Sequence, residues 1–202
     1  MPARQKFFNK SAATWDRRFQ TKELLDFLEN LISDLNLRPG DYILDVGTGT
    51  GILIPFLLEA VGPTGYVTAV DYAEKMVELC REKFSSFSNF NVFVQQAEEL
   101  QFGSESFDAI TCFGLFPHLE NKGEALRQMN RVLKPGGRLI IVHALSSMEI
   151  RNHHINASSA VAEDVLPDDA QMRELLSRAG FGQISIADKP GRYLCLSVKP
   201  LK

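Results

Sequence analysis

Cysteine is scarce in this sequence. Its three cysteines, Cys80, Cys112 and Cys195, are odd in number and form no Cys-x-x-Cys pair. This pattern predicts neither a disulfide framework nor a zinc site, and we expect buried, reduced thiols instead. The neighbouring His153 and His154 are not expected to form a metal site, so no metal is predicted.

Long apolar runs are also missing. No stretch approaches the roughly 18 apolar residues of a membrane span, and the N-terminus lacks the apolar core of a secretory signal. We therefore expect a cytoplasmic protein without a membrane partner.

A strong excess of positive charge is absent as well. The net charge is −3 over 202 residues, and the isoelectric point is near 5.8. Nucleic-acid binders concentrate Lys and Arg, so a small-molecule partner is expected rather than a nucleic acid. The length and the 45% hydrophobic content fit a single domain over residues 1–202, as a monomer or homodimer.

What the sequence does contain is a regular alternation of apolar strands and amphipathic helices. Strands are predicted at 42–46, 66–70, 91–95, 107–113 and 138–143. Helices are predicted at 24–35, from near 52, at 73–84, around 125–133 and at 168–179, and Lys134–Gly137 is expected to be a turn. Two further strands, 183–187 and 193–198, are close enough to form an antiparallel hairpin. This order predicts an α/β fold with a doubly wound, seven-stranded, mostly parallel sheet, an antiparallel last strand and helices on both faces.

A glycine-rich run, Asp45-Val46-Gly47-Thr48-Gly49-Thr50-Gly51, follows the first strand. Glycines at a strand-to-helix turn let a ligand approach backbone amides and the positive end of a helix. The dinucleotide fingerprint would need a third glycine at position 52 or 54, and both are Ile. Asp71 ends the next strand, 20 positions after Gly51, where it can accept hydrogen bonds from both ribose hydroxyls of an adenosine cofactor.

Four segments in order resemble the class I, Rossmann-like methyltransferases that depend on S-adenosylmethionine. They are 43–51, 70–71, 97–100 with 107–110, and 133–139, so that the resemblance spans about 41–143. It implies methyl transfer from S-adenosylmethionine, with S-adenosylhomocysteine as product, in an enzyme of the small-molecule type. By the same resemblance the cofactor contacts are Asp45, Gly47, Thr48, Gly49 and Gly51 at the amino-acid part, Asp71 at the ribose, Tyr72, Met76, Gln96 and Ala97 at the adenine, and Phe113 near the ammonium group. Many relatives carry Asp where this chain has Gln96.

The histidines are the candidates for catalysis, although an activated sulfonium makes a base optional. His143 ends a strand at the ligand-binding edge of the sheet, and its alternative role is structural. His153 and His154 lie in the long connection, and helical neighbours diverge, so at most one would face a site. His118 either resembles a common substrate-side position or only begins a helix.

Two flanking segments complete the expected organisation. Residues 1–20 are similar to an N-terminal arm that folds over the cofactor, with a docked arm anchored by Trp15 as the alternative. Residues 144–167 are expected to be a substrate-side insert or lid.

Other functions remain in competition with small-molecule methyl transfer. Amino-directed enzymes for nucleic acid or protein usually carry Asn or Asp, then Pro-Pro and an aromatic, where this chain has Cys112-Phe113-Gly114-Leu115. Scarce cysteines oppose an arsenic methyltransferase, and Ile52 and Ile54 oppose a nicotinamide oxidoreductase. A non-catalytic module that only binds S-adenosylmethionine stays open.

Overall fold

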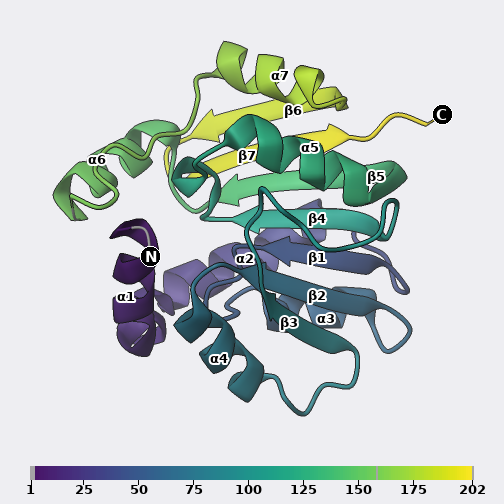
Figure 1. Cartoon of the computed structure of the whole chain (residues 1–202), viewed down its shortest axis with the longest axis horizontal. Helices are drawn as coiled ribbons and strands as arrows, with labels where there is room; N and C mark the ends of the chain where they lie inside the picture. The colour runs from purple at the N-terminus through teal and green to yellow at the C-terminus, as the bar shows by residue number, and fades with distance from the viewer. Residues whose placement is uncertain (1–2, 158, 202) are drawn as a thin grey trace. The chain divides into compact units, whose positions relative to one another are not determined.

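The computed structural model describes residues 3–157 and 159–201, which fall into two compact units, 1–96 and 97–202. The first unit contains four helices and three strands among its described residues (Figure 1). They are α1 (Ala3–Phe19), α2 (Lys22–Asp34), β1 (Tyr42–Val46), α3 (Ile54–Val61), β2 (Tyr66–Asp71), α4 (Glu74–Lys83) and β3 (Phe90–Val94).

The strands of the first unit are parallel, with β2 paired to β1 on one side and to β3 on the other. Four consecutive residues of β1, from Ile43 to Val46, are buried. Successive side chains of a strand point to opposite faces, so both faces of β1 are covered. The largely apolar sequences of β1 and β2 fit this burial on both faces.

The helices of this unit begin where local chemistry favours it. Thr21 caps α2 and accepts a hydrogen bond from the amide of Leu24 at 3.3 Å. Pro55 lies in the first turn of α3, where a missing amide hydrogen costs nothing. The helix starts at Ile54 rather than near Ile52, because the residues after Gly51 continue the turn.

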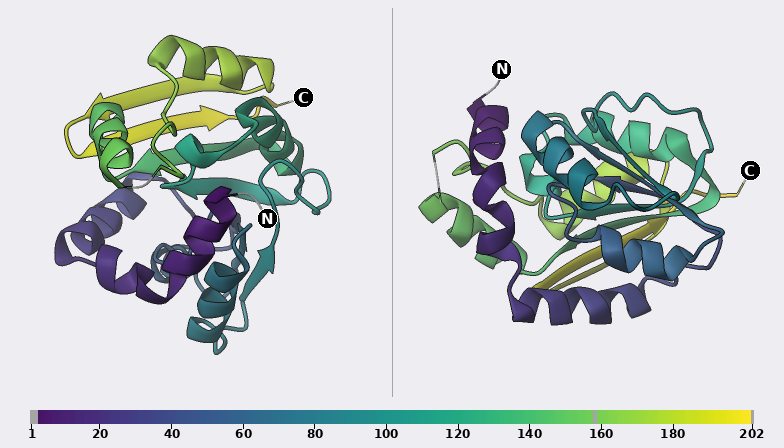
Figure 2. Two further views of the ribbon diagram at one scale, coloured as in Figure 1. Left: turned by 60° about the vertical axis from the view of Figure 1, so that its left-hand side comes forward. Right: turned by 90° about the horizontal axis from the view of Figure 1, so that it is seen from below.

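The N-terminal segment is a helix, α1, that packs against α4. Ala12 is buried with Ala73 and Met76, and Phe8 and Trp15 pack against the same cluster. Both views in Figure 2 show α1 alongside α4. The predicted arm is therefore a docked helix, whose aromatic residues face its neighbour.

The second unit contains β4 (Phe107–Phe113), the short 3-10 helix η1 (Phe116–His118), α5 (Lys122–Val132), β5 (Leu133–His143), α6 (Ser147–Ala157), α7 (Asp169–Arg178), β6 (Gly182–Lys189) and β7 (Arg192–Val198). β4 and β5 are parallel, and β7 is antiparallel to both β5 and β6. The strand order is β3-β2-β1-β4-β5-β7-β6. The predicted fold, a seven-stranded mostly parallel α/β sheet with an antiparallel last strand, is confirmed.

One predicted boundary is wrong. The turn expected at 134–137 is part of β5, which begins at Leu133 instead of Arg138. The pairing register shifts between Phe107↔Leu133 and Ala109↔Arg138, so these residues form an irregular stretch of strand. Backbone bonds from Gly136 N to Lys199 O (2.8 Å) and from Lys199 N to Gly137 O (2.9 Å) hold it in the ladder.

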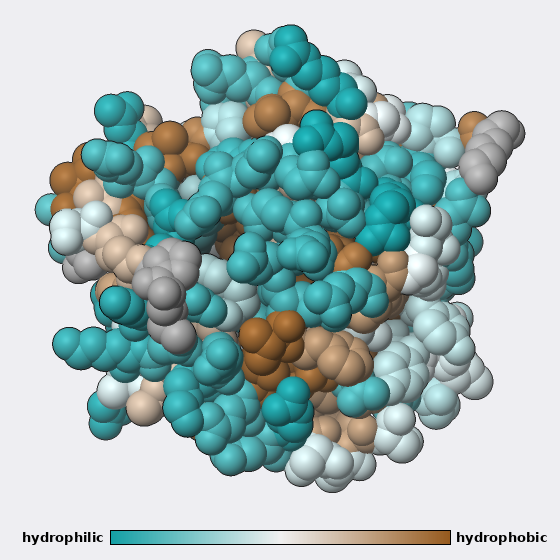
Figure 3. Space-filling view, viewed as in Figure 1, coloured by the Kyte–Doolittle hydropathy of each residue, from teal (hydrophilic) through white to brown (hydrophobic). Residues whose placement is uncertain are grey.

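The long connection after β5 contains a helix, α6. Two of its large apolar side chains are well exposed. Met148 is 71% exposed and Ile155 is 58% exposed. Figure 3 shows apolar surface in the region of α6, on a face that is otherwise mostly hydrophilic. Among the described residues, no helix combines the length and the apolar character that a membrane crossing needs.

Candidate functional site

The glycine loop of the first unit is fixed by its backbone. Gly47, Gly49 and Gly51 have φ of +76°, +56° and +87°, the left-handed region that favours glycine. The amides of Gly47 and Thr48 both donate to the carbonyl of Val70, at 2.8 and 3.1 Å. The loop is thereby anchored to β2.

Gly51 is required for a second reason, which the motif alone does not reveal. A Cβ at this position would lie 2.5 Å from Cε2 of Phe84 and 2.8 Å from Sγ of Cys80. Cys80 is on α4 and Phe84 follows it, so the loop and this helix approach too closely for any side chain. Burial raises the pKa of the Cys80 thiol to about 12, with the charge of Asp45 adding to it.

Asp71 joins the tip of β2 to the glycine loop. Its Oδ2 accepts from the amide of Gly49 at 2.9 Å, and its Oδ1 accepts from the amide of Ala73 at 2.8 Å. Burial raises the pKa of Asp71 to about 6, against the lowering effect of these two bonds. A carboxylate has about four lone-pair sites, so it keeps the capacity to accept two more hydrogen bonds. That capacity suits a ribose diol.

Helix α1 is tied to the glycine loop and to the end of α4. Asp16 accepts a hydrogen bond from the hydroxyl of Thr50 and forms an ion pair with Lys83 at 2.7 Å. Nε1 of Trp15 lies 3.6 Å from the position that a Cβ on Gly49 would occupy. The N-terminal helix therefore covers the loop within this unit.

The remaining residues predicted for the cofactor differ in exposure. Asp45 and Met76 are buried, Met76 in the cluster that α1 covers, and Tyr72 packs against that cluster. Gln96 is exposed at the end of the first unit. In the second unit Ala97 is buried, and Phe113 at the end of β4 is half-buried. Their contacts with a cofactor stay predictions.

His143 lies buried at the end of β5, 6% exposed. Its register partner on β7 is Tyr193, and the two ring centroids are 6.1 Å apart. Neither Nε2 of His143 nor the hydroxyl of Tyr193 has a hydrogen-bond partner among the described residues. Burial, with smaller contributions from His118 and His154, lowers the pKa of His143 to about 3, so the imidazole is neutral at ordinary pH.

Two more histidines meet at Asp164. Nδ1 of His118 lies 2.6 Å from Oδ2 of Asp164, and Nδ1 of His154 lies 2.6 Å from the backbone oxygen of the same residue. The rings of His118 and His154 are 4.8 Å apart. His153 is exposed and His154 is buried, in agreement with the prediction that at most one of them faces inward.

Asp164 is a residue that sequence reasoning missed. It is 46 positions from His118 and 10 from His154, and no motif marks it. The one available signal was its position in the long connection, together with the histidines. The side chain of Asp164 is only 5% exposed, and the sequence of the connection does not indicate this burial.

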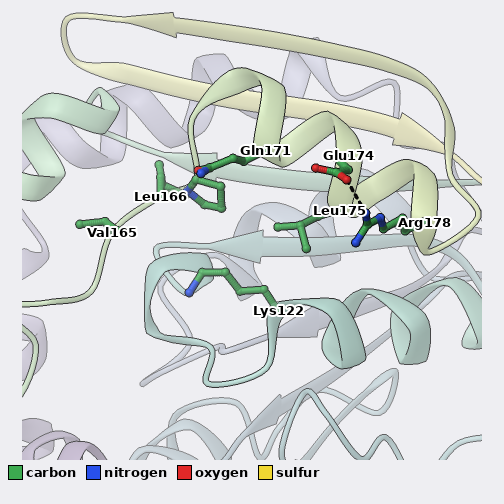
Figure 4. Close-up of a pocket in the computed structure, with 8 residues that line it drawn as sticks. Lys122, Val165, Leu166, Gln171, Glu174, Leu175 and Arg178 are labelled. Atoms are coloured by element: carbon green, nitrogen blue, oxygen red, sulfur yellow. Dashed lines mark ion pairs between the residues drawn. The ribbon is translucent and has the colours of Figure 1, made fainter.

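A surface groove of about 410 Å³ also lies in the second unit, between the start of α5 and α7 (Figure 4). It is lined by Lys122, Val165, Leu166, Pro167, Gln171, Glu174, Leu175 and Arg178. Glu174 and Arg178 form an ion pair across one helical turn, and Lys122 donates to the carbonyls of Pro117 and Leu119. These charges are already engaged, and none of the predicted site residues lines the groove.

Within the described part of the chain, no group of three or more His, Cys, Asp or Glu residues is arranged to hold a metal ion.

The comparisons with known proteins agree with this geometry. A family described as "Methyltransferase domain" matches residues 43–137. Demethylmenaquinone methyltransferase of Staphylococcus aureus (strain JH9) is 42% identical over 113 residues, which are 55% of this chain and 46% of that protein. The chain thus spans about half the length of the curated relatives it matches.

Solved structures show the same fold. A methyltransferase dependent on S-adenosylmethionine from Aquifex aeolicus has a TM-score of 0.71 at 24% identity, covering 85% of this chain and 89% of that one. Phosphoethanolamine N-methyltransferase 2 of Haemonchus contortus, in complex with phosphomonomethylethanolamine and S-adenosylhomocysteine, has a TM-score of 0.76 at 15% identity, covering 95% of this chain and 57% of that one.

Residues 43–137 are thus a methyltransferase domain of the class I, Rossmann-like kind. The family predicted from the four sequence segments is confirmed over these residues.

Proposed function

We propose that this protein transfers a methyl group from S-adenosylmethionine to a small-molecule acceptor. The observation that carries the proposal is the link between Gly49 and Asp71, which holds a carboxylate with unused lone pairs beside the glycine loop. The relative from Staphylococcus aureus, named for a small-molecule acceptor, supports the choice of acceptor class.

Different residues of the first unit would contact different parts of the cofactor. The glycine loop, which has no side chains at Gly47, Gly49 and Gly51, lets the amino-acid part lie against its backbone, and Asp71 accepts hydrogen bonds from the ribose hydroxyls. Asp45 balances the ammonium group, and Tyr72 and Met76 pack against the adenine. Helix α1 excludes water over the loop. When bound, S-adenosylmethionine supplies an activated methyl group, so the chain has mainly to orient an acceptor.

The second unit has proposed contacts of its own. Ala97, together with Gln96 from the first unit, contacts the adenine, and Phe113 offers its carbonyl near the ammonium group. His143 and His154 contact the acceptor; both are buried. His153 is exposed and has no part in this proposal.

The acceptor class is supported by charge. The net charge of −3 disfavours binding of a phosphate backbone, and the sequence after β4 lacks the Pro-Pro motif of amino-directed enzymes. A neutral, compact acceptor suits the buried histidines better than a polymer does.

Calorimetry followed by a transfer assay tests the proposal. S-adenosylhomocysteine should bind the whole chain and NAD should not, and the protein with S-adenosylmethionine should form S-adenosylhomocysteine when a pool of small metabolites is added. Binding of NAD alone contradicts the cofactor. Transfer to protein or nucleic acid only, or binding without transfer to any pool, contradicts the acceptor class or the catalysis.

A further inference from the structure

Helix α1 carries a line of positive charges on its outer side. Lys6, Lys10 and Arg17 are all exposed. At about 100° and about 1.5 Å per residue, they lie within about 40° of one another around the helix axis and extend about 16 Å along it. We call these three residues the basic stripe. Phe8 and Trp15 lie on the opposite side of α1 and pack toward α4 (Figure 2), so the basic stripe faces away from α4.

The basic stripe has no acidic partner within the protein. Among the described residues, the side chains of Lys6, Lys10 and Arg17 form no ion pair and no hydrogen bond. Four other helices pair basic residues with carboxylates one turn away. These pairs are Lys22–Asp26 in α2, Lys75–Glu78 in α4, Arg127–Glu124 in α5, and Arg173–Asp169 and Arg178–Glu174 in α7. The basic stripe lacks this neutralisation.

The basic stripe does little for the stability of its own helix. Lys6 and Lys10 are like charges at i and i+4, which repel each other. The first turn of α1 holds no acidic residue that would offset the positive end of the helix dipole, and only Arg17, in the last turn, is well placed for that dipole. Local helix chemistry therefore gives no reason for these cations, whereas an anionic partner does.

Positive charge is a property of α1 and not of the chain as a whole. The helix contains five basic residues and one acidic residue, while the whole chain has a net charge of −3. The acidic residue, Asp16, is engaged by Thr50 and Lys83. Salt at physiological strength screens charges over about 8 Å, so a partner that touches α1 meets mainly the basic stripe.

The surface around the basic stripe favours one kind of anionic partner. Protein partners usually bind through an apolar or aromatic centre, and α1 exposes no large apolar side chain among its described residues. Tight binding of a nucleic acid neutralises about 6 to 10 phosphates, more than this stripe can contact. An anionic lipid surface needs neither a pocket nor an apolar contact, because each Lys or Arg beside it strengthens binding by about fivefold.

We propose that the basic stripe docks the protein on a membrane surface that contains anionic phospholipids. This inference goes beyond the proposed methyl transfer and does not depend on it. The ammonium groups of Lys6 and Lys10 and the guanidinium of Arg17 contact the lipid headgroups, while the aromatic side of α1 stays packed toward α4. No segment enters the hydrocarbon layer, so the docking needs no long apolar run in the sequence. Three contacts make it weak, reversible and sensitive to salt.

Cosedimentation with lipid vesicles tests the proposal on the whole chain. The protein should bind vesicles of phosphatidylcholine mixed with phosphatidylglycerol, and it should not bind vesicles of phosphatidylcholine alone. Binding should be lost when NaCl is raised from about 0.1 M to about 1 M, because the screening length falls from about 10 Å to about 3 Å. The triple variant Lys6→Gln, Lys10→Gln and Arg17→Gln should bind the mixed vesicles on the order of 100-fold more weakly.

A matched control separates the basic stripe from net charge. The triple variant Lys22→Gln, Arg127→Gln and Arg178→Gln removes the same number of positive charges from exposed side chains of other helices. It should bind the mixed vesicles as the wild type does. The melting temperature of the stripe variant should equal that of the wild type or exceed it, because its three side chains have no described ion pair to lose.

Three results would overturn the proposal. The first is no binding to the mixed vesicles, or equal binding by the stripe variant and the wild type. The second is an equal loss of binding in the control variant, which would assign adsorption to net charge alone. The third is binding of polyglutamate or of a DNA duplex instead of the vesicles, which would replace the lipid surface by an acidic polypeptide or a nucleic acid.

Discussion

The amide of Gly49 donates a hydrogen bond to Oδ2 of Asp71 over 2.9 Å, although the two residues are 22 positions apart. The glycine turn and the carboxylate that we propose for the ribose hydroxyls are therefore mechanically coupled. Movement of either one displaces the other.

Replacing Asp71 by Asn should weaken S-adenosylhomocysteine binding by about 1 to 3 kcal/mol. The amide keeps the volume of the carboxylate but loses the charge and half of its accepting capacity. Isothermal titration calorimetry measures the change. An affinity equal to that of the wild type would remove Asp71 from the site.

Cofactor affinity should depend on pH through the same residue. The pKa of Asp71 is raised to about 6, and its ionised form accepts more hydrogen bonds than its protonated form. Affinity for S-adenosylhomocysteine should therefore rise as the pH increases through about 6 and level off roughly one unit higher. The Asp71→Asn variant should show a flat profile over this range, and parallel profiles in both proteins would assign the titration to another group.

Gly51→Ala should destabilise the protein more than Gly62→Ala does. Both glycines have positive φ, +87° and +63°, so both substitutions strain the backbone. Only at Gly51 does the new Cβ meet other atoms, at 2.5 Å from Phe84, whereas nothing lies within 4 Å at Gly62. The excess should be about 1 to 3 kcal/mol in urea unfolding. Equal losses would mean that backbone strain alone sets the cost.

Trp15→Ala should loosen α1 and speed the dissociation of S-adenosylhomocysteine. The indole packs against the cluster of Ala12, Ala73 and Met76, and a loss of about 1 kcal/mol corresponds to roughly fivefold. Stopped-flow dissociation measures it. Tyr42→Ala, an aromatic truncation at a 48% exposed position, is the control and should leave the rate unchanged.

His143→Gln should make stability less sensitive to acid. The pKa of His143 falls from 6.5 to about 3 on folding, so the unfolded chain binds a proton that the folded chain refuses. Wild-type stability is therefore lost as the pH falls from about 6.5 toward 3, by up to roughly 5 kcal/mol from this group. Urea unfolding at several pH values should give a shallower slope for the variant; identical slopes would show that His143 takes up its proton without resistance.

The strands along the chain and the glycine loop were predictable because both depend on local sequence. Apolar runs gave the strands, and Gly47, Gly49 and Gly51 marked the turn that later proved to need positive φ. The start of β5 was not predictable, since Lys134–Gly137 reads as a turn and is held in the strand by distant Lys199.

The site was predictable only in part, because some of its contacts join residues that are distant in the sequence. Asp71 followed from its spacing to the loop, but its bond to Gly49 depends on folding. The meeting of His118, His154 and Asp164 depends on where a long connection places its residues, and no periodicity encodes that.

Cys80, Cys112 and Cys195 are buried, so their reaction with a thiol reagent reports local or global unfolding of the protein. A thiol reagent can modify them only after local or global exposure, and burial raises the pKa of Cys80 and of Cys195 to about 12, which slows the reaction further. Cys80 belongs to the first unit and the other two to the second. Peptide mapping of the labelled thiols would therefore measure the rate of opening of each unit separately, with no residue replaced.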